Sequence, residues 1–175
     1  MVSLPSRLIQ LLAACLTAGS AAAAPVPEFD LKAAFVYNFA LFTDWPADAQ
    51  FVAGALNVCV HPASVMRPSL GSLNDRMVKG RKIAVRQLAA PEDIRGCQLF
   101  FADASDRERW PQIRKALANA PVLTITDDEE IRHDGSIVSL SSEGSRIVFD
   151  IDLRAARNAR LMLSSKLLRL ARSVQ

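Results

Sequence analysis

The sequence predicts a single α/β domain with a mixed, mostly parallel sheet, an antiparallel hairpin at one edge, and flanking helices. Short apolar runs alternate with helical segments between residues 55 and 126, and strands separated by helices pair in parallel through right-handed crossovers. After Gly135 this alternation stops, and two strand-like runs follow each other across a Ser-Glu-Gly-Ser turn, which is typical of a hairpin. A helix near the N-terminus is apolar on almost every side, so it needs a sheet or a partner to cover it.

The first residues of the chain are typical of an export signal. Arg7 supplies a positive charge, the apolar run after it is too short to span a bilayer, and four alanines provide the small residues that a signal peptidase requires. We therefore expect residues 1–24 to be a signal peptide and residues 28–175 to form the exported domain. An alternative stays open, because the Leu-Ala-Ala-Cys sequence that ends at Cys15 also fits a lipobox, in which Cys15 would carry a lipid anchor.

The apolar helix is predicted over residues 31–46. Trp45 and Pro46 end it, since the residue before a proline is pushed out of the helical region. Asn38 is the polar residue hardest to explain within this apolar segment. It is either a buried amide that satisfies backbone groups of a nearby loop or a contact to a ligand.

The elements that follow are predicted from apolar runs and the turn residues between them. The predicted strands are residues 55–60, 82–87, 99–102, 122–126, 136–141 and 146–151, with helices at 63–70 and 110–119. The acidic run at residues 127–130 lacks the alternation of oxygen ligands in a calcium loop. We expect it to be a solvated turn.

The last predicted helix, from residue 153 to about 173, carries two apolar tracks. The core track consists of Ala156, Ala159, Leu163, Leu167 and Leu170. Leu161 and Leu168 lie on roughly the opposite side, between Arg154, Arg157 and Arg172. The helix is either sandwiched within its own domain, or these five residues form a protein interface, since apolar anchors with an arginine rim are typical of recognition surfaces.

The cysteines agree with export. Apart from Cys15 the chain has two, Cys59 and Cys97, and disulfides persist in the compartments outside the cytosol. Both lie on or next to predicted strands that can be neighbours in the sheet. We expect them to form a disulfide rather than remain two separate buried thiols, and the absence of a Cys-x-x-Cys pair argues against a redox-active site.

Composition and motifs point away from enzymes and nucleic-acid binding. Of the 21 Lys and Arg residues Arg7 lies in the leader, which leaves 20 against 18 Asp and Glu, so the exported part is close to neutral. The basic residues near the C-terminus fall all round a helical wheel without interleaved aromatics, which makes a poor nucleic-acid groove. His61 and His133 have no second ligand at metal-binding spacing. Nucleophile-elbow, dinucleotide-binding and phosphate-loop motifs are missing from the sequence. We expect no catalytic residues, no metal and no cofactor.

Several blocks of this sequence are similar to motifs of one protein family. In the apolar helix they are Lys32, Phe35, Tyr37, Asn38, Phe39, Trp45 and Pro46; later they are Cys97 with Phe100 and Phe101, the run from Pro121 to Ile125, and Ser164, Ser165 and Lys166. Together they span nearly the whole domain, which resembles the YfiR/HmsC-like family of periplasmic regulators. Two departures, Asp152 where the family usually has Asn and Arg160 where Gly is usual, bear on partner specificity more than on the fold.

The resemblance implies a function that composition does not. A member of this family is expected to be a non-enzymatic periplasmic protein that binds and represses the sensor domain of an inner-membrane diguanylate cyclase, thereby lowering cyclic-di-GMP and biofilm formation. The resemblance also implies a homodimer and a second partner, an outer-membrane lipoprotein. The alternative function is a periplasmic small-molecule binding protein, with its ligand in the crevice at the carboxyl ends of the parallel strands.

Overall fold

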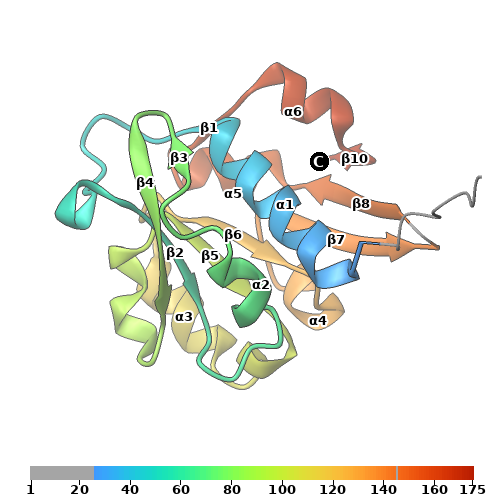
Figure 1. Cartoon of the computed structure of the whole chain (residues 1–175), viewed down its shortest axis with the longest axis horizontal. Coiled ribbons are helices and arrows are strands. Elements are labelled where there is room, and N and C mark those ends of the chain that lie inside the picture. The colour runs from blue at the N-terminus through green and yellow to red at the C-terminus, as the bar shows by residue number, and fades with distance from the viewer. Residues whose placement is uncertain (1–25, 145) are drawn as a thin grey trace, which may run out of the picture.

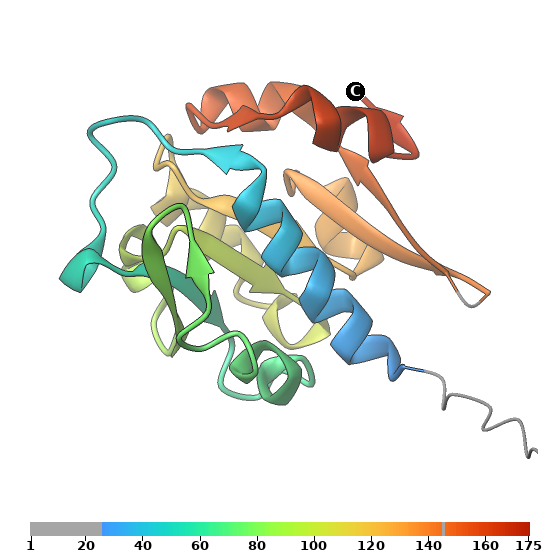
Figure 2. The same cartoon turned by 45° about the horizontal axis from the view of Figure 1, so that its top comes forward.

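A computed structural model describes residues 26–144 and 146–175 and has three layers, with a central sheet between two sets of helices. Figures 1 and 2 show α1 (Glu28–Leu41) running across one face, next to α2 (Arg67–Gly71). The opposite face is covered by α3 (Trp110–Leu117), α4 (Glu129–His133) and a 3₁₀ segment, Pro91–Gly96. The predicted signal peptide and Cys15 lie outside the described residues, among which no helix has the length and apolar character to cross a bilayer.

The sheet confirms the predicted fold class. Its order within the described residues is β10-β8-β7-β6-β5-β2-β4-β3, and only the β7–β8 and β3–β4 pairs are antiparallel. The strands are β2 (Leu56–Val60), β3 (Met77–Val78), β4 (Arg81–Gln87), β5 (Leu99–Ala102), β6 (Leu123–Thr126), β7 (Val138–Glu143), β8 (Arg146–Ile151) and β10 (Ser173–Val174). A separate two-stranded ribbon pairs β1 (Thr43–Asp44) with β9 (Met162–Leu163). The predicted hairpin is β7–β8, close to one edge of the sheet.

Helix α1 buries one side rather than its whole circumference. Val36 and Phe39 are fully buried, and the ring of Phe39 packs edge-on against Phe149 of β8, with centroids 5.0 Å apart. The opposite side, with Ala34 and Asn38, is exposed. The expectation of a buried Asn38 is therefore wrong: its amide Nδ2 donates to the Ala34 carbonyl one turn earlier, at 3.0 Å. The helix also ends before the predicted Trp-Pro stop, because the chain enters β1 after Leu41.

The predicted disulfide is confirmed. Cys59 lies in β2 and Cys97 just before β5, and these two strands are parallel neighbours. The Cα atoms are 5.8 Å apart and the bond closes a loop with a sequence separation of 38. In the chain-entropy account, a disulfide that closes a loop of that length stabilises the folded state by about 4 kcal/mol.

The acidic run at 127–130 is not a solvated turn. Asp128 is buried and is the N-cap of α4, since its side chain accepts a hydrogen bond from the Ile131 N–H at 3.1 Å. Two glutamates then occupy the first turn of this helix, where the macrodipole favours negative charge. The prediction is wrong because the buried Ile131 anchors this segment against the sheet as a helix.

The predicted continuous C-terminal helix is wrong as well. The segment consists of α5 (Leu153–Asn158), β9, α6 (Ser165–Leu170) and β10. At the end of α5, Arg160 has a left-handed φ of 56°, and the N–H of Leu161 donates to the Ala156 carbonyl at 2.9 Å. This is the usual glycine-terminated helix end. Ser164 then caps α6, with its Oγ accepting from the Leu167 N–H at 3.2 Å.

The left-handed residue at the end of α5 gives a testable prediction. Arg160→Val should lower the free energy of unfolding by roughly 1–2 kcal/mol, because a β-branched side chain is strained at positive φ. Arg160→Gly should stay within about 1 kcal/mol of wild type, since relief of strain offsets the lost, exposed ion pair with Asp48. Urea denaturation measures both. Equal stabilities for the two variants would contradict the role of backbone conformation at this position.

Candidate functional site

The carboxyl ends of the parallel strands are occupied by paired polar groups. The strand order reverses between β2 and β5, where the Ser64 hydroxyl donates to the buried carboxylate of Asp103. Nearby, the fully buried Asp106 bonds Arg109 at 2.7 Å, and burial raises the pKa of Asp106 despite this contact. Because these side chains satisfy one another, their arrangement holds loops together rather than offering an open crevice to a ligand.

Lys32 links α1 to Asp127, which follows the carboxyl end of β6. Its Nζ lies 2.7 Å from both Glu28 Oε1 and Asp127 Oδ2, and its side chain is only 8% exposed. Burial disfavours the charged ammonium, but the hydrogen bonds from the two carboxylates outweigh it and raise the pKa of Lys32. This motif residue is therefore part of the structural framework.

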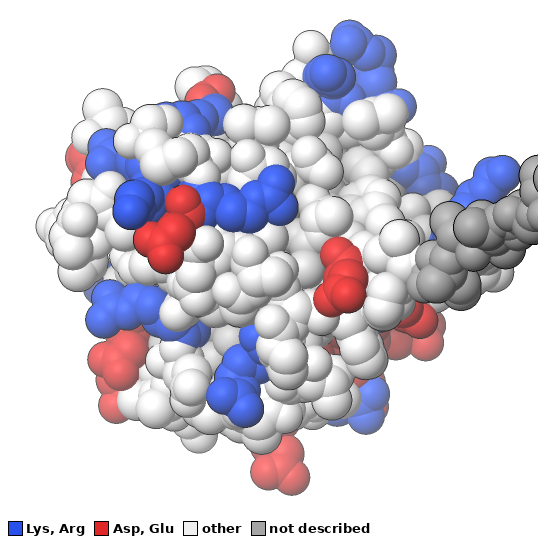
Figure 3. Space-filling model, in the orientation of Figure 1, with Lys and Arg blue, Asp and Glu red and all other residues white. Residues whose placement is uncertain are grey.

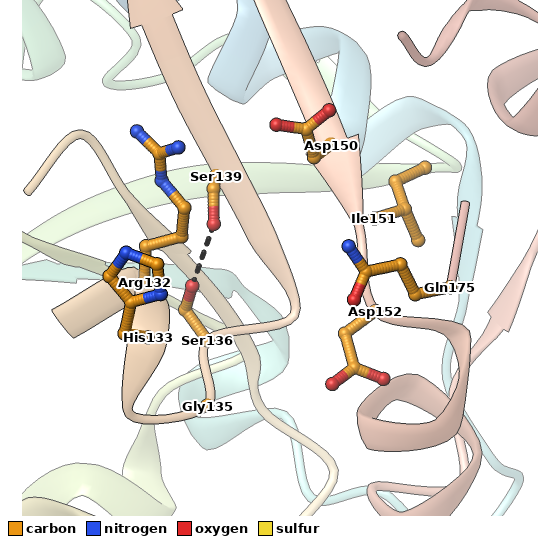
Figure 4. Close-up of a pocket in the computed structure, with 9 residues that line it drawn as sticks. All are labelled: Arg132, His133, Gly135, Ser136, Ser139, Asp150, Ile151, Asp152 and Gln175. Carbon is orange, nitrogen blue, oxygen red and sulfur yellow. Dashed lines mark hydrogen bonds between the residues drawn. The ribbon is translucent and has the colours of Figure 1, made fainter. Parts of the chain in front are cut away.

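A polar pocket of about 320 Å³ lies where β7 begins and β8 ends. Figure 4 shows its two sides, one with Arg132, His133 and the Ser136 and Ser139 hydroxyls, which are 3.1 Å apart, and the other with Asp150 and Asp152. Both carboxylates already have partners: Asp150 is held by Arg172, and Asp152 caps α5 through the Ala155 N–H at 2.8 Å. The acidic groups of this pocket therefore serve the fold.

The outer edge of β8 is open along the first half of the strand. Strand β10 pairs with β8 only at Asp150 and Ile151, so residues 146–148 have no strand neighbour on that side among the described residues. The Phe149 carbonyl accepts from the Arg172 N–H, and alternate residues of a strand direct their backbone groups to the same edge. The N–H and C=O of Ile147 therefore face outward. At the opposite edge, the β3–β4 hairpin and the Asn74 side chain, which accepts from the Val85 N–H, protect β4.

An apolar groove lies beside this open edge, between α1, β8 and α6. Its volume is about 320 Å³, and it is lined by Phe35, Ile147, Val148, Phe149, Leu170 and Arg172. Phe35 is held in place by its ring contacts with Phe39 and Phe149, at 6.0 and 5.9 Å. Leu170 is 64% exposed although it is aliphatic. We refer to these six lining residues as the β8 groove; an unprotected strand edge next to apolar side chains is a site for pairing with another chain.

Arg172 forms the polar end of the β8 groove. Its guanidinium donates to Asp150 Oδ1 at 3.0 Å and to Glu143 Oε1 at 2.5 Å. These contacts lower the pKa of Asp150 and raise that of Arg172. The arginine is thus fixed on the sheet, and its aliphatic stem extends the apolar wall of the groove.

The five residues predicted as an interface do not lie on one helix face. Leu161 is 3% exposed and belongs to the main core, and Leu168 is half-buried against that core. Arg154 and Arg157 are exposed on α5, whereas Arg172 lies beyond α6 in its ion pairs. The prediction from helical spacing is wrong because the helix is broken at Arg160 and a new helix begins at Ser165.

The predicted core track is partly right. Ala156 and Leu167 are buried, Ala159 and Leu163 are partly buried, and Leu170 is exposed in the β8 groove. Ile147 and Leu170 were therefore missed as surface residues of interest. The alternation along residues 146–151 could have indicated Ile147, but an exposed Leu170 required knowledge of the helix break.

The remaining family-motif residues have structural contacts. The Tyr37 hydroxyl donates to the Met77 carbonyl at 3.0 Å, and Trp45 Nε1 donates to the Gln98 carbonyl at 3.3 Å. The Lys166 ammonium lies 5.2 Å from the centroid of the Phe42 ring. Pro46 is half-buried, and Ser165 is exposed in the first turn of α6. These contacts join α1 to the β3–β4 hairpin, the sheet and α6.

Comparisons with known proteins agree with this architecture. A sequence model of the family described as YfiR/HmsC-like matches residues 29–172, whereas none of the curated proteins matches this chain. Among solved structures, a conserved domain protein from Vibrio cholerae O1 biovar El Tor strain N16961 is similar, with a TM-score of 0.53 and 12% sequence identity over 87% of this chain. The chain covers 62% of that protein's length. At this identity the likeness is evidence of a shared fold alone.

Proposed function

Because this chain belongs to the YfiR/HmsC-like family, we propose that it is a periplasmic regulator that binds the sensor domain of an inner-membrane diguanylate cyclase and holds it inactive. Family membership indicates a regulatory role in cyclic-di-GMP signalling rather than a catalytic one. In this proposal residues 1–24 are the export signal. Self-association and a second, outer-membrane lipoprotein partner are further parts of the same proposal.

The observation that carries the partner-binding proposal is the open edge of β8 beside the β8 groove. An extended segment of the partner would pair its backbone with the outward N–H and C=O of Ile147, as in other cases of strand addition. An apolar side chain of that segment would enter between Phe35 and Leu170. Exposed Arg146 and Arg169 next to the groove favour an acidic residue in the same segment.

The test uses one substitution in the β8 groove and one matched control. Leu170→Glu places a charge where the partner's apolar side chain would lie, and we expect it to weaken binding to the purified sensor domain by about tenfold or more. In a deletion strain it should fail to restore low cyclic-di-GMP. Val65→Glu changes an aliphatic residue of similar exposure, 62%, in the loop after β2, and should bind and repress as wild type does.

Two outcomes would count against the proposal in different ways. Normal binding and repression by Leu170→Glu would show that the partner uses another surface. Deletion of the gene without any rise in cyclic-di-GMP would contradict the regulatory function itself. Melting curves of both variants should stay close to wild type, because both positions are largely exposed.

A further inference from the structure

Two segments far apart in sequence form one protruding end of the molecule, opposite the β8 edge. They are the loop of residues 45–54 and the β3–β4 hairpin. The guanidinium of Arg81 lies 3.9 Å from the centroid of the Phe51 ring and donates to the Gly54 carbonyl at 3.3 Å, so the two segments are held together. A cavity of about 270 Å³ between them is walled by Trp45 and Phe51, with Lys79 and Arg81 on the hairpin side. We refer to this loop and hairpin as the basic tip.

The basic tip carries an excess of positive charge. Figure 3 shows Lys and Arg side chains over the β3–β4 hairpin, at the upper left of the view, with a smaller number of acidic side chains between them. The basic residues of the hairpin and its flanks are Arg76, Lys79, Arg81, Lys82 and Arg86, and the acidic residues of the tip and its surroundings are Asp44, Asp48 and Asp75. Asp44 pairs with Lys79, and Asp48 pairs with Arg160. The Lys82–Asp75 pair is long, at 3.4 Å, and both side chains are exposed. Among the described residues, Arg76, Arg81 and Arg86 make no ion pair.

Apolar side chains project from the same tip. Met77 is 52% exposed on the hairpin, and Val52 is 46% exposed on the loop. Arg76 lies flat on the ring of Tyr37, 3.9 Å from its centroid, which keeps its charge at the surface next to Met77. Aliphatic tips and aromatic rings surrounded by Lys and Arg are the combination found on protein surfaces that lie against anionic bilayers.

We propose that the basic tip docks on an anionic phospholipid surface. Arg76, Arg81 and Lys82 contact lipid phosphates, and Val52 and Met77 enter the boundary between headgroups and acyl chains. This site is independent of the β8 groove and of any protein partner. The two sites are at opposite edges of the sheet, and at about 5 Å per strand they lie roughly 30 Å apart. Docking through the tip therefore leaves the β8 groove facing away from the bilayer, free for a protein domain.

The proposal is tested by flotation of the purified protein with vesicles. We expect binding to vesicles of phosphatidylglycerol mixed with phosphatidylcholine, none to phosphatidylcholine alone, and loss of binding at high salt. Arg76→Glu with Lys82→Glu should reduce the partition coefficient by about tenfold or more, and Met77→Ser should reduce it by severalfold. Lys115→Glu with Arg154→Glu removes the same charge from exposed positions elsewhere and should retain most of the binding.

Melting curves establish that each variant is folded before it is compared. Equal binding to neutral and anionic vesicles, unchanged binding of Arg76→Glu with Lys82→Glu, or equal losses for the tip pair and the control pair would each overturn the proposal. Met77→Ser carries no charge change, so it tests the apolar contact separately. None of these outcomes depends on repression of a cyclase, and failure here leaves the proposed function untouched.

Discussion

Replacing Leu161 with glutamate is expected to unfold the domain. The side chain is 3% exposed in the main core, next to Ala156 and Leu167. Truncating such a leucine to alanine lowers the free energy of unfolding by roughly 2–5 kcal/mol. A carboxylate at this position adds the penalty of burying a charge without a partner. The total free energy of unfolding of a domain of this size is about 5–15 kcal/mol. We therefore expect no cooperative thermal transition near that of wild type.

The neighbouring residue provides the control for this prediction. Met162 is 68% exposed, so Met162→Glu should change the free energy of unfolding by less than about 1 kcal/mol. Circular dichroism melts of the two variants measure the difference directly. A Leu161→Glu variant that melts within a few degrees of wild type would mean that Leu161 lies at the surface, as the spacing of a continuous helix suggests.

Replacing Lys32 with methionine is expected to have the second largest effect. The Lys32 side chain is almost closed to solvent, and its ammonium bridges the half-exposed Glu28 and the more buried Asp127. Its removal leaves Asp127, 15% exposed, without a cation. Breaking a pair of this kind should lower the free energy of unfolding by roughly 2–4 kcal/mol at neutral pH. Urea denaturation measures the loss.

A double-mutant cycle separates the ion pair from simple packing. Lys32→Met combined with Asp127→Asn should be more stable than the sum of the single effects predicts, by about 1–3 kcal/mol. Additive effects would show that the Lys32–Asp127 pair has no interaction energy of its own.

The pH dependence of stability gives a second check on Lys32. Its pKa is raised on folding, above the ordinary value of 10.5, so its charge contributes stability that is fully present below that pH. This contribution is lost as the pH rises through the folded pKa. Wild type should therefore lose stability at alkaline pH more steeply than Lys32→Met does.

Local sequence patterns determine most of the sheet. A strand is a short apolar run between turn residues, and both signals lie within a few neighbouring positions. The runs predicted at 55–60 and 99–102 are accordingly found as β2 and β5, and placing one cysteine near each was enough to predict the disulfide. The hairpin at β7–β8 was predicted for the same reason. Motif similarity along the chain identified the family.

Signals at the C-terminal helix break were present in the sequence but ambiguous. Ser164 is a good N-cap residue, and the family resemblance described above implies a glycine position at Arg160. Each is also compatible with a continuous helix. Long-range packing resolved the ambiguity, since Leu161 is buried against the core and Leu163 pairs with Thr43 in the β1–β9 ribbon.

Only the tertiary structure decided which faces of the helices are covered and where the surface is open. Helical spacing places Leu161 and Leu168 on one face only while the helix continues, and the left-handed Arg160 ends that relation. The β8 groove likewise joins Phe35, Ile147 and Leu170 from three separate elements. Periodicity records which residues share a side of one element, whereas burial depends on the element that packs against that side. The fold class and the disulfide therefore follow from the sequence, but the candidate binding surfaces follow from packing between distant segments.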